Sequence, residues 1–131
     1  MYCLPYAVGV SPALGIRGMI AVSRIRKGSV IERCPVILVP KKEQIHLFKT
    51  KVRNYYFDWT NKDCAVVLGY GSLVNHSFTP NAYYRWDYKA KHLTYVALKD
   101  IQEGEEVTIN YNGDPADMTP LDSGLVSSKS Y

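Results

Sequence analysis

Two stretches of this sequence combine side chains that could bind or orient a reacting group. The first is the segment 75–81 (Asn-His-Ser-Phe-Thr-Pro-Asn), which is too polar for a core strand and too apolar for a free loop. Its Asn and His side chains offer hydrogen-bond donors and acceptors, so they could order a buried irregular backbone or bind the edge of a heterocycle. The second is the segment 100–111, a turn and a strand that end at Tyr111. Taken alone, His76 is more typical of a satisfied structural histidine, and Tyr111 of a core ring with a bonded hydroxyl.

The elements that must position these stretches are mostly strands. Runs of β-branched and aromatic residues indicate strands at 28–39, 65–68, 82–88 and 92–98, and the last two are joined by a hairpin-length turn. Pro35 indicates a bulge or an edge in the first of them. The pattern predicts a mainly β fold class.

Two further elements are expected. Residues 107–111 alternate so that Val107, Ile109 and Tyr111 share one face of a strand. The spacing of Ile45 and Phe48 predicts a short helix over residues 42–49.

Length and composition limit the class of protein. The chain has 131 residues, of which 47% are hydrophobic and 21% are charged, as expected for one globular domain over 1–131. No apolar stretch approaches the roughly 20 residues that span a bilayer. Three cysteines without a CxxC pair fit neither a disulfide framework nor a structural zinc site. We therefore expect no metal and a reducing compartment, by default the cytoplasm.

Charge is distributed unevenly along the chain. Residues 41–53 hold five basic side chains and one acidic one, whereas residues from 100 onward hold seven acidic and one basic. The ordinary interpretation of both charged runs is that they lie on solvated faces. The more specific interpretation of the acidic run is a rim that attracts a cationic peptide. The basic run with Tyr55, Tyr56 and Trp59 also has the residue types of a nucleic-acid binder. These aromatics lie too close together to face outward as a group, so nucleic acid is disfavoured.

In this order, the segments resemble the SET domain, the fold of one large class of protein lysine methyltransferases. The resemblance runs from about residue 15 to residue 113. Residues 15–21 resemble the family's glycine-containing turn, 25–32 its I-x-x-G-x-x-I-x-E strand, 75–81 its NHSxxPN motif and 96–111 its A-x-x-D-I-x-x-G-E-E-L-T-x-x-Y motif. The last two motifs in this order are specific, whereas the turn alone is weak evidence.

The resemblance implies the family's fold and its site. The fold is a β-clip-like set of short curved sheets with a knot-like crossing and one or two short helices, in which 75–81 passes beside the segment near Tyr111. Tyr111 would be the catalytic residue, and Tyr84, with Tyr70 and Tyr56 as weaker candidates, would line the lysine channel. S-adenosyl-L-methionine would be contacted by Ile16, Arg17, Gly18, Met19, Asn75, His76 and Tyr111.

The physical chemistry agrees with these implied roles. A free lysine, with a pKa of about 10.4, is protonated at neutral pH and must lose its proton before it can accept a methyl group. A narrow aromatic channel and the approaching sulfonium charge both disfavour the ammonium form. A tyrosine hydroxyl can then orient the amine lone pair toward the methyl group. The expected substrate is a protein or peptide lysine, for instance in a basic histone-like tail.

The sequence also departs from the family pattern. Ile16 stands where the first glycine of the turn is expected, and Phe78 replaces a cysteine that often follows the NHS triplet. No Cys-rich segment precedes Gly15 or follows Tyr111, so we expect a minimal domain without pre-SET or zinc post-SET parts. The tail 114–131, flexible or covering the channel, or a homodimer partner would then close the channel.

The sequence leaves two alternatives open. The first concerns activity, since a decayed cofactor turn would leave an inactive SET-like module that binds a peptide or partner. The second concerns location, which is nuclear rather than cytoplasmic if the source is eukaryotic or the chain acts on host chromatin.

Overall fold

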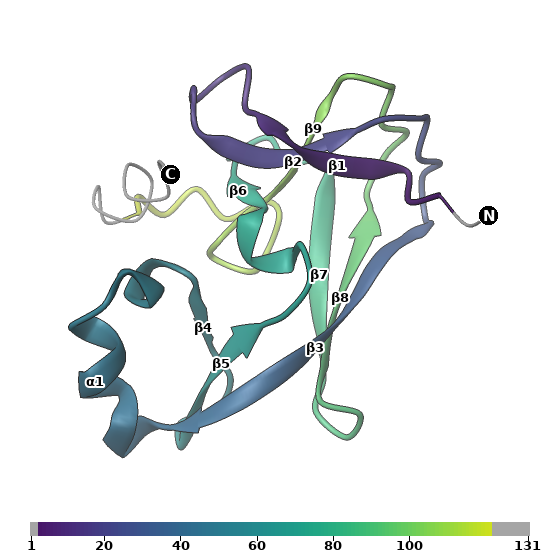
Figure 1. Ribbon diagram of the computed structural model, residues 1–131. Coiled ribbons are helices and arrows are strands. Elements are labelled where there is room, and N and C mark those ends of the chain that lie inside the picture. Colours follow the sequence, from purple (N-terminus) through teal and green to yellow (C-terminus); the bar gives the residue numbers. More distant parts are fainter. Residues whose placement is uncertain (1–2, 122–131) are drawn as a thin grey trace.

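Two curved sheets build the domain in this computed structural model, which describes residues 3–121 (Figure 1). The smaller sheet has the spatial order β1-β2-β9-β6. Its strands are β1 (Tyr6–Val10), β2 (Arg17–Ala21), β9 (Glu106–Ile109) and β6 (Asn75–His76). The first three are antiparallel, and β6 runs parallel to β9.

The larger sheet is antiparallel throughout and has the order β4-β5-β3-β8-β7. Its strands are β4 (Tyr56–Asp58), β5 (Asp63–Val67), β3 (Val30–Pro40), β8 (His92–Ala97) and β7 (Ala82–Asp87). The predicted mainly β fold class is confirmed. The strand expected at 28–39 is β3, that at 65–68 overlaps β5, and the expected hairpin is β7 with β8.

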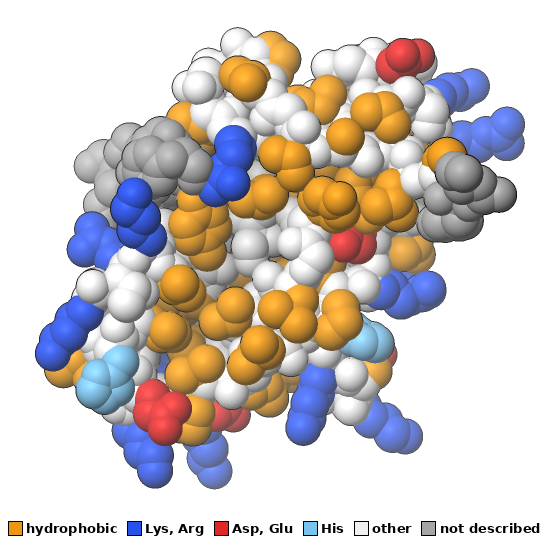
Figure 2. Space-filling model, in the orientation of Figure 1, with side chains coloured by type: hydrophobic (Ala, Val, Ile, Leu, Met, Phe, Trp, Pro, Cys, Tyr) orange, Lys and Arg blue, Asp and Glu red, His pale blue; other side chains and the backbone are white. Residues whose placement is uncertain are grey.

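Short helical turns connect the strands. The helix expected over 42–49 is present as η1 (Lys41–Glu43) and α1 (Gln44–Phe48), followed by η2 (Lys51–Asn54), while η3 (Gly71–Leu73) precedes β6. Lys and Arg side chains surround the α1 region at the lower left of Figure 2, as expected for a solvated basic run. No helix within residues 3–121 has the length and apolar character needed to cross a membrane.

Pro35 occupies the point where β3 changes partner. Residues up to Pro35 pair with β8, and residues from Val36 onward pair with β5. The expectation of a bulge or edge at Pro35 is therefore wrong in detail, because the irregular pairing lies between Val30 and Glu32. A residue without an N–H group is tolerated inside this long strand at the junction between two ladders.

One hydrophobic core joins the two sheets. Its largest fully buried side chains include Tyr95 and Leu93 from β8, Met19 from β2 and Ile109 from β9. The Tyr95 hydroxyl satisfies its hydrogen bond inside this core by donating to the Gly71 carbonyl at 2.8 Å. Trp59 is also buried, so it is unavailable as a surface platform for nucleic acid.

The segments 75–81 and 106–111 lie side by side, as the resemblance implied. Besides the β6–β9 ladder, Asn81 joins them through both ends of its amide. Its Nδ2 donates to the Glu106 carbonyl at 2.7 Å, and its Oδ1 accepts from the Thr108 N–H at 2.9 Å. A buried side chain thus supplies the pairing that the short β6 strand cannot.

Tyr111 does not continue the strand, contrary to the expectation that Val107, Ile109 and Tyr111 share one face. Strand β9 ends at Ile109, and Asn110 is buried at 1% exposure. The Asn110 amide accepts from the Asn112 N–H and donates to the Asp117 carbonyl, which bends the chain away from the ladder. The tail is described only to residue 121, so most of the tail expectation, residues 122–131, lies outside the described residues.

Glu32 ties β3 to the turn that leads into η3. Its Oε1 accepts from the Tyr70 N–H at 3.3 Å, while its Oε2 is buried without a hydrogen-bond partner in the described part of the chain. Gly69 has φ +69°, and a Cβ there would collide with the Glu32 carboxylate. Burial raises the pKa of Glu32, although hydrogen bonds with Tyr70, Cys34 and Tyr6 oppose the shift.

This raised pKa predicts a specific pH dependence of stability. As pH rises above the ordinary Glu pKa, the unfolded chain releases the Glu32 proton while the folded chain retains it, so the unfolded state gains stability. The free energy of unfolding should therefore fall from that pH until the raised pKa is passed. Urea titrations of the wild type and Glu32→Gln between pH 4 and pH 8 check this. Parallel curves for the two proteins would contradict it.

Candidate active site

Tyr111 and His76 meet although 35 positions separate them in the sequence. The Tyr111 N–H donates to His76 Nδ1 at 3.0 Å, and the two ring centroids lie 5.3 Å apart. The Tyr111 hydroxyl donates to the Val74 carbonyl at 2.8 Å. Tyr111 is therefore fixed at both its backbone and its phenol by the segment that enters β6.

The protonation states of these groups follow from burial. Burial lowers the pKa of His76, so the imidazole stays neutral and its Nδ1 stays an acceptor. The remaining proton then belongs to Nε2, which is buried without a hydrogen-bond partner among the described residues. Burial, followed by the charge of Glu106, raises the pKa of Tyr111, so the phenol remains protonated.

A polar network connects the glycine turn to β6 and β9. Asn75 is 1% exposed, and its Nδ2 donates to the Arg17 carbonyl and to Glu106 Oε2, both at 2.7 Å. The Ser11 hydroxyl donates to Glu106 Oε1 at 2.5 Å. A Cβ on Gly18 would collide with the Glu106 carboxylate and lie 2.9 Å from Asn75 Nδ2. A side chain at position 18 would therefore displace the Glu106 carboxylate or the Asn75 amide from this network. Glu106, for which the sequence predicted no role, joins β9 to Ser11 and to Asn75.

The turn residues expected to contact a cofactor lie in different environments. Ile16 is half-buried and Arg17 is exposed, whereas Gly18 and Met19 are buried. Because the Met19 side chain belongs to the core, only its backbone is available to a ligand. Gly15 has φ +70°, and a Cβ added there would face open space.

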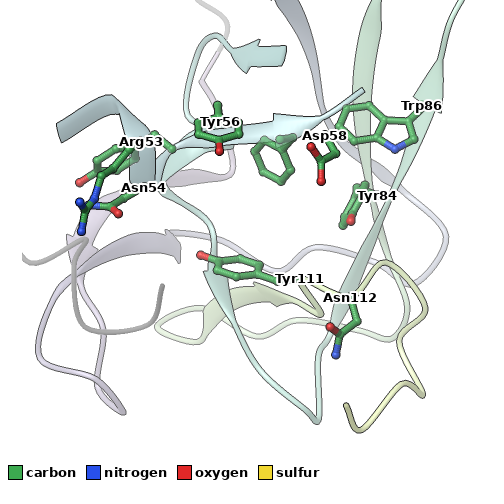
Figure 3. Close-up of a pocket in the computed structure, with 10 residues that line it drawn as sticks. Arg53, Asn54, Tyr56, Asp58, Tyr84, Trp86, Tyr111 and Asn112 are labelled. Carbon is green, nitrogen blue, oxygen red and sulfur yellow. The ribbon is translucent and has the colours of Figure 1, made fainter. Parts of the chain in front are cut away.

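An aromatic pocket of about 410 Å³ adjoins Tyr111 (Figure 3). It brings together three of the tyrosines expected in the site, Tyr56, Tyr84 and Tyr111. Burial, then the charge of Asp58, raises the pKa of Tyr84. The full lining is Arg53, Asn54, Tyr55, Tyr56, Phe57, Asp58, Tyr84, Trp86, Tyr111 and Asn112.

The structure does not bring Tyr70 to this pocket. Tyr70 instead packs edge-on against Tyr6, with ring centroids 5.4 Å apart. Sequence reasoning missed Phe57 and Trp86, whose rings pack against Tyr84 at 6.0 and 5.5 Å. Trp86 could have been found, because it lies two residues after Tyr84 in a strand and so shares its face.

The site has one feature that fits S-adenosylmethionine. The buried Nε2 of His76 is a donor without an acceptor among the described residues, so an acceptor atom of a ligand could satisfy it. Within residues 3–121 no group of three or more His, Cys, Asp or Glu side chains could hold a metal ion.

Comparison with known proteins gives a consistent result. The model of the SET domain family matches residues 16–112. A relative from Schizosaccharomyces pombe, a histone-lysine N-methyltransferase specific for lysine 37 of histone H3, is 32% identical over 96 residues. The alignment covers 72% of this chain and 65% of that protein. The protein "plastid transcriptionally active 14" of Arabidopsis thaliana is 42% identical over 48 residues, 35% of this chain and 10% of its own length.

Solved structures of two other proteins have folds similar to that of this chain. A candidate histone methyltransferase of Plasmodium falciparum superposes with a TM-score of 0.69 at 28% identity, covering 84% of this chain and 95% of that one. A chain of a humanized mutant of the Chaetomium thermophilum Polycomb repressive complex 2 superposes with a TM-score of 0.69 at 22% identity, over 84% of this chain and 15% of that one. The second likeness concerns the fold alone.

Proposed function

Because the chain belongs to the SET-domain family, we propose that it transfers a methyl group from S-adenosylmethionine to the side-chain amine of a protein lysine. The observation that carries the proposal is the position of Tyr111. It is bonded to His76 and Val74 on one side and lines the aromatic pocket on the other. One residue would thus adjoin both the cofactor and the amine, as a two-substrate transfer requires.

The cofactor would be held by the turn at residues 15–19 together with Asn75, His76 and Tyr111. When bound, it supplies an electrophilic methyl group on a positively charged sulfur. The neutral His76 can donate from Nε2 to an acceptor of the ligand, while its Nδ1 keeps Tyr111 in place. Asn75 contributes by fixing the Arg17 carbonyl and hence the path of the turn.

The pocket suits the lysine side chain. Tyr56, Phe57, Tyr84 and Trp86 offer ring surfaces to the aliphatic stem and keep water from it. Such a poorly hydrated lining lowers the pKa of an amine, so the neutral nucleophile becomes more populated.

Tyr111 orients that nucleophile. Its hydroxyl donates its proton to the Val74 carbonyl, and a phenol oxygen that donates its proton can itself accept an N–H of the amine. Accepting one N–H fixes the direction of the nitrogen lone pair, which must point along the axis of displacement.

We extend the proposal to the boundaries of the site. Residues 15–113 form the catalytic core, and residues from 114 onward begin a cover for the channel. The contacts that support this are made by Asn112, which lines the pocket and donates to the Thr119 carbonyl at 2.8 Å.

We also propose a homodimer. It is supported by exposed apolar side chains on the edge strand β1, with Val8 42% and Val10 70% exposed. Light scattering should give about twice the 14.8 kDa mass of the chain, and a mass near 14.8 kDa would contradict the dimer.

The substrate class is a lysine in a protein, with a basic histone-like tail as the leading candidate. The S. pombe relative, whose name specifies histone H3, supports this choice. The corresponding location is the nucleus in a eukaryotic cell or on host chromatin, and the cytoplasm otherwise.

The test is transfer of tritiated methyl groups to a panel of histones and lysate proteins. We expect label on lysine and, by calorimetry, binding of S-adenosylmethionine to the chain alone. Binding of peptides without any binding of the cofactor at millimolar concentration would instead identify an inactive binding module.

A further inference from the structure

The aromatic pocket has opposite charges at its two ends. Arg53 and Asn54 lie at one end and Asp58 and Trp86 at the other, with Tyr111 between them (Figure 3). Among the ten residues that line the pocket, Arg53 is the only one with a positively charged side chain, and Asp58 is the only one with a negatively charged side chain.

Asp58 is available to a ligand. Its side chain is 80% exposed, and its one salt bridge within residues 3–121 is to Lys41, with Nζ 3.8 Å from Oδ1. Long ion pairs between exposed side chains contribute little, so a better-placed cation can replace Lys41. The field of Asp58 also reaches into the pocket, since its charge acts on the Tyr84 hydroxyl.

Arg53 is also available to a ligand. It is exposed at the end of η2, and no salt bridge joins it to an acidic side chain in the described range. A guanidinium presents a planar fork of donors that fits a carboxylate.

We propose that Arg53 and Asp58 recognise the charged residues that flank the target lysine. They would select a peptide with a basic residue on one side of that lysine and an acidic residue on the other. This inference rests on the proposed function for the identity of the central residue. The lysine side chain enters between the tyrosines, the basic neighbour docks at Asp58, and the acidic neighbour docks at Arg53. Exposed charges of this kind favour one orientation of a peptide more than they add affinity.

Fluorescence anisotropy with four labelled peptides tests this directly. Each has one central lysine, flanked by arginine then glutamate, glutamate then arginine, arginine on both sides, or alanine on both sides. One of the two mixed peptides should bind the wild type about three- to fivefold more tightly than the other, as expected for charges at an exposed rim. The preference should weaken as salt is raised.

Charge variants assign the effect to the two residues. Asp58→Asn and Arg53→Gln should each reduce the preference, and the double variant Arg53→Glu with Asp58→Lys should reverse it. Glu103→Gln and Lys89→Gln remove the same charges from exposed positions that do not line the pocket, and they should leave the preference unchanged.

The outcomes separate this inference from the proposed function. Equal binding of the two mixed peptides, or equal effects of the pocket and control variants, would contradict recognition of the flanking charges by Arg53 and Asp58. Charge-dependent binding without methyl transfer to any peptide would overturn the proposed function but would still support this recognition. Absence of binding by every peptide would overturn both.

Discussion

The variant Tyr111→Phe should lose methyl transfer by at least about 100-fold while S-adenosylmethionine still binds. Phenylalanine keeps the ring and the backbone N–H that donates to His76, but it lacks the oxygen that would accept an amine hydrogen. Misorientation of a reacting group by about 1 Å is sufficient for a loss of this order. The measurement is the single-turnover rate with tritiated cofactor, beside calorimetric titration of the cofactor.

The same substitution removes a hydrogen bond from the Val74 carbonyl. We therefore expect a loss of about 1 kcal/mol of stability, which leaves the protein folded. Tyr88→Phe is the matched control, because Tyr88 is 56% exposed and does not line the pocket. A Tyr111→Phe protein with the turnover of the Tyr88→Phe protein would exclude the proposed role of the hydroxyl.

Among the proposed substitutions, Asn75→Asp should cause the largest loss of stability. The Asn75 amide nitrogen donates to the Arg17 carbonyl and to Glu106, and a carboxylate in its place would face two acceptors with no donor. An uncompensated charge in a site that is 1% exposed costs about 3–5 kcal/mol, against a total of about 5–15 kcal/mol for a typical domain. Urea unfolding at pH 7 measures this loss.

Asn61→Asp makes the same chemical change at an exposed position and should unfold within about 0.5 kcal/mol of the wild type. The Asn75→Asp protein should also recover part of its stability at acid pH, where one of the two facing carboxyl groups binds a proton. Equal unfolding midpoints for Asn75→Asp and Asn61→Asp would show that the Asn75 network does not hold the turn in place.

The strands that could be predicted are those whose side chains alternate or form continuous apolar runs. Strands β3, β7 and β8 were found in this way, because their residues are buried on one or both faces. Strand β1 was missed, since Val8 and Val10 are exposed and carry no pattern of burial. Strand β6 has two residues and forms through pairing with β9, which no local pattern reports.

The site was predicted unevenly for a similar reason. Asn75, His76 and Tyr111 lie in motifs that resemble those of a known family, and the structure places them together. Phe57 reaches the pocket from β4 only because the larger sheet curves until β4 and β7 approach each other, as the contact of Phe57 with Trp86 shows. Contacts between the two edge strands of a sheet depend on its curvature, which a single sequence does not encode locally.

The proposed function requires the methyl donor and the amine to meet at Tyr111. A crystal structure of the chain with S-adenosylhomocysteine and a lysine peptide is the decisive measurement. We expect the adenine beside His76, the lysine stem between Tyr56 and Tyr84, and the sulfur facing the amine beside the Tyr111 hydroxyl. A ligand bound away from His76, or a lysine bound outside the aromatic pocket, would contradict it.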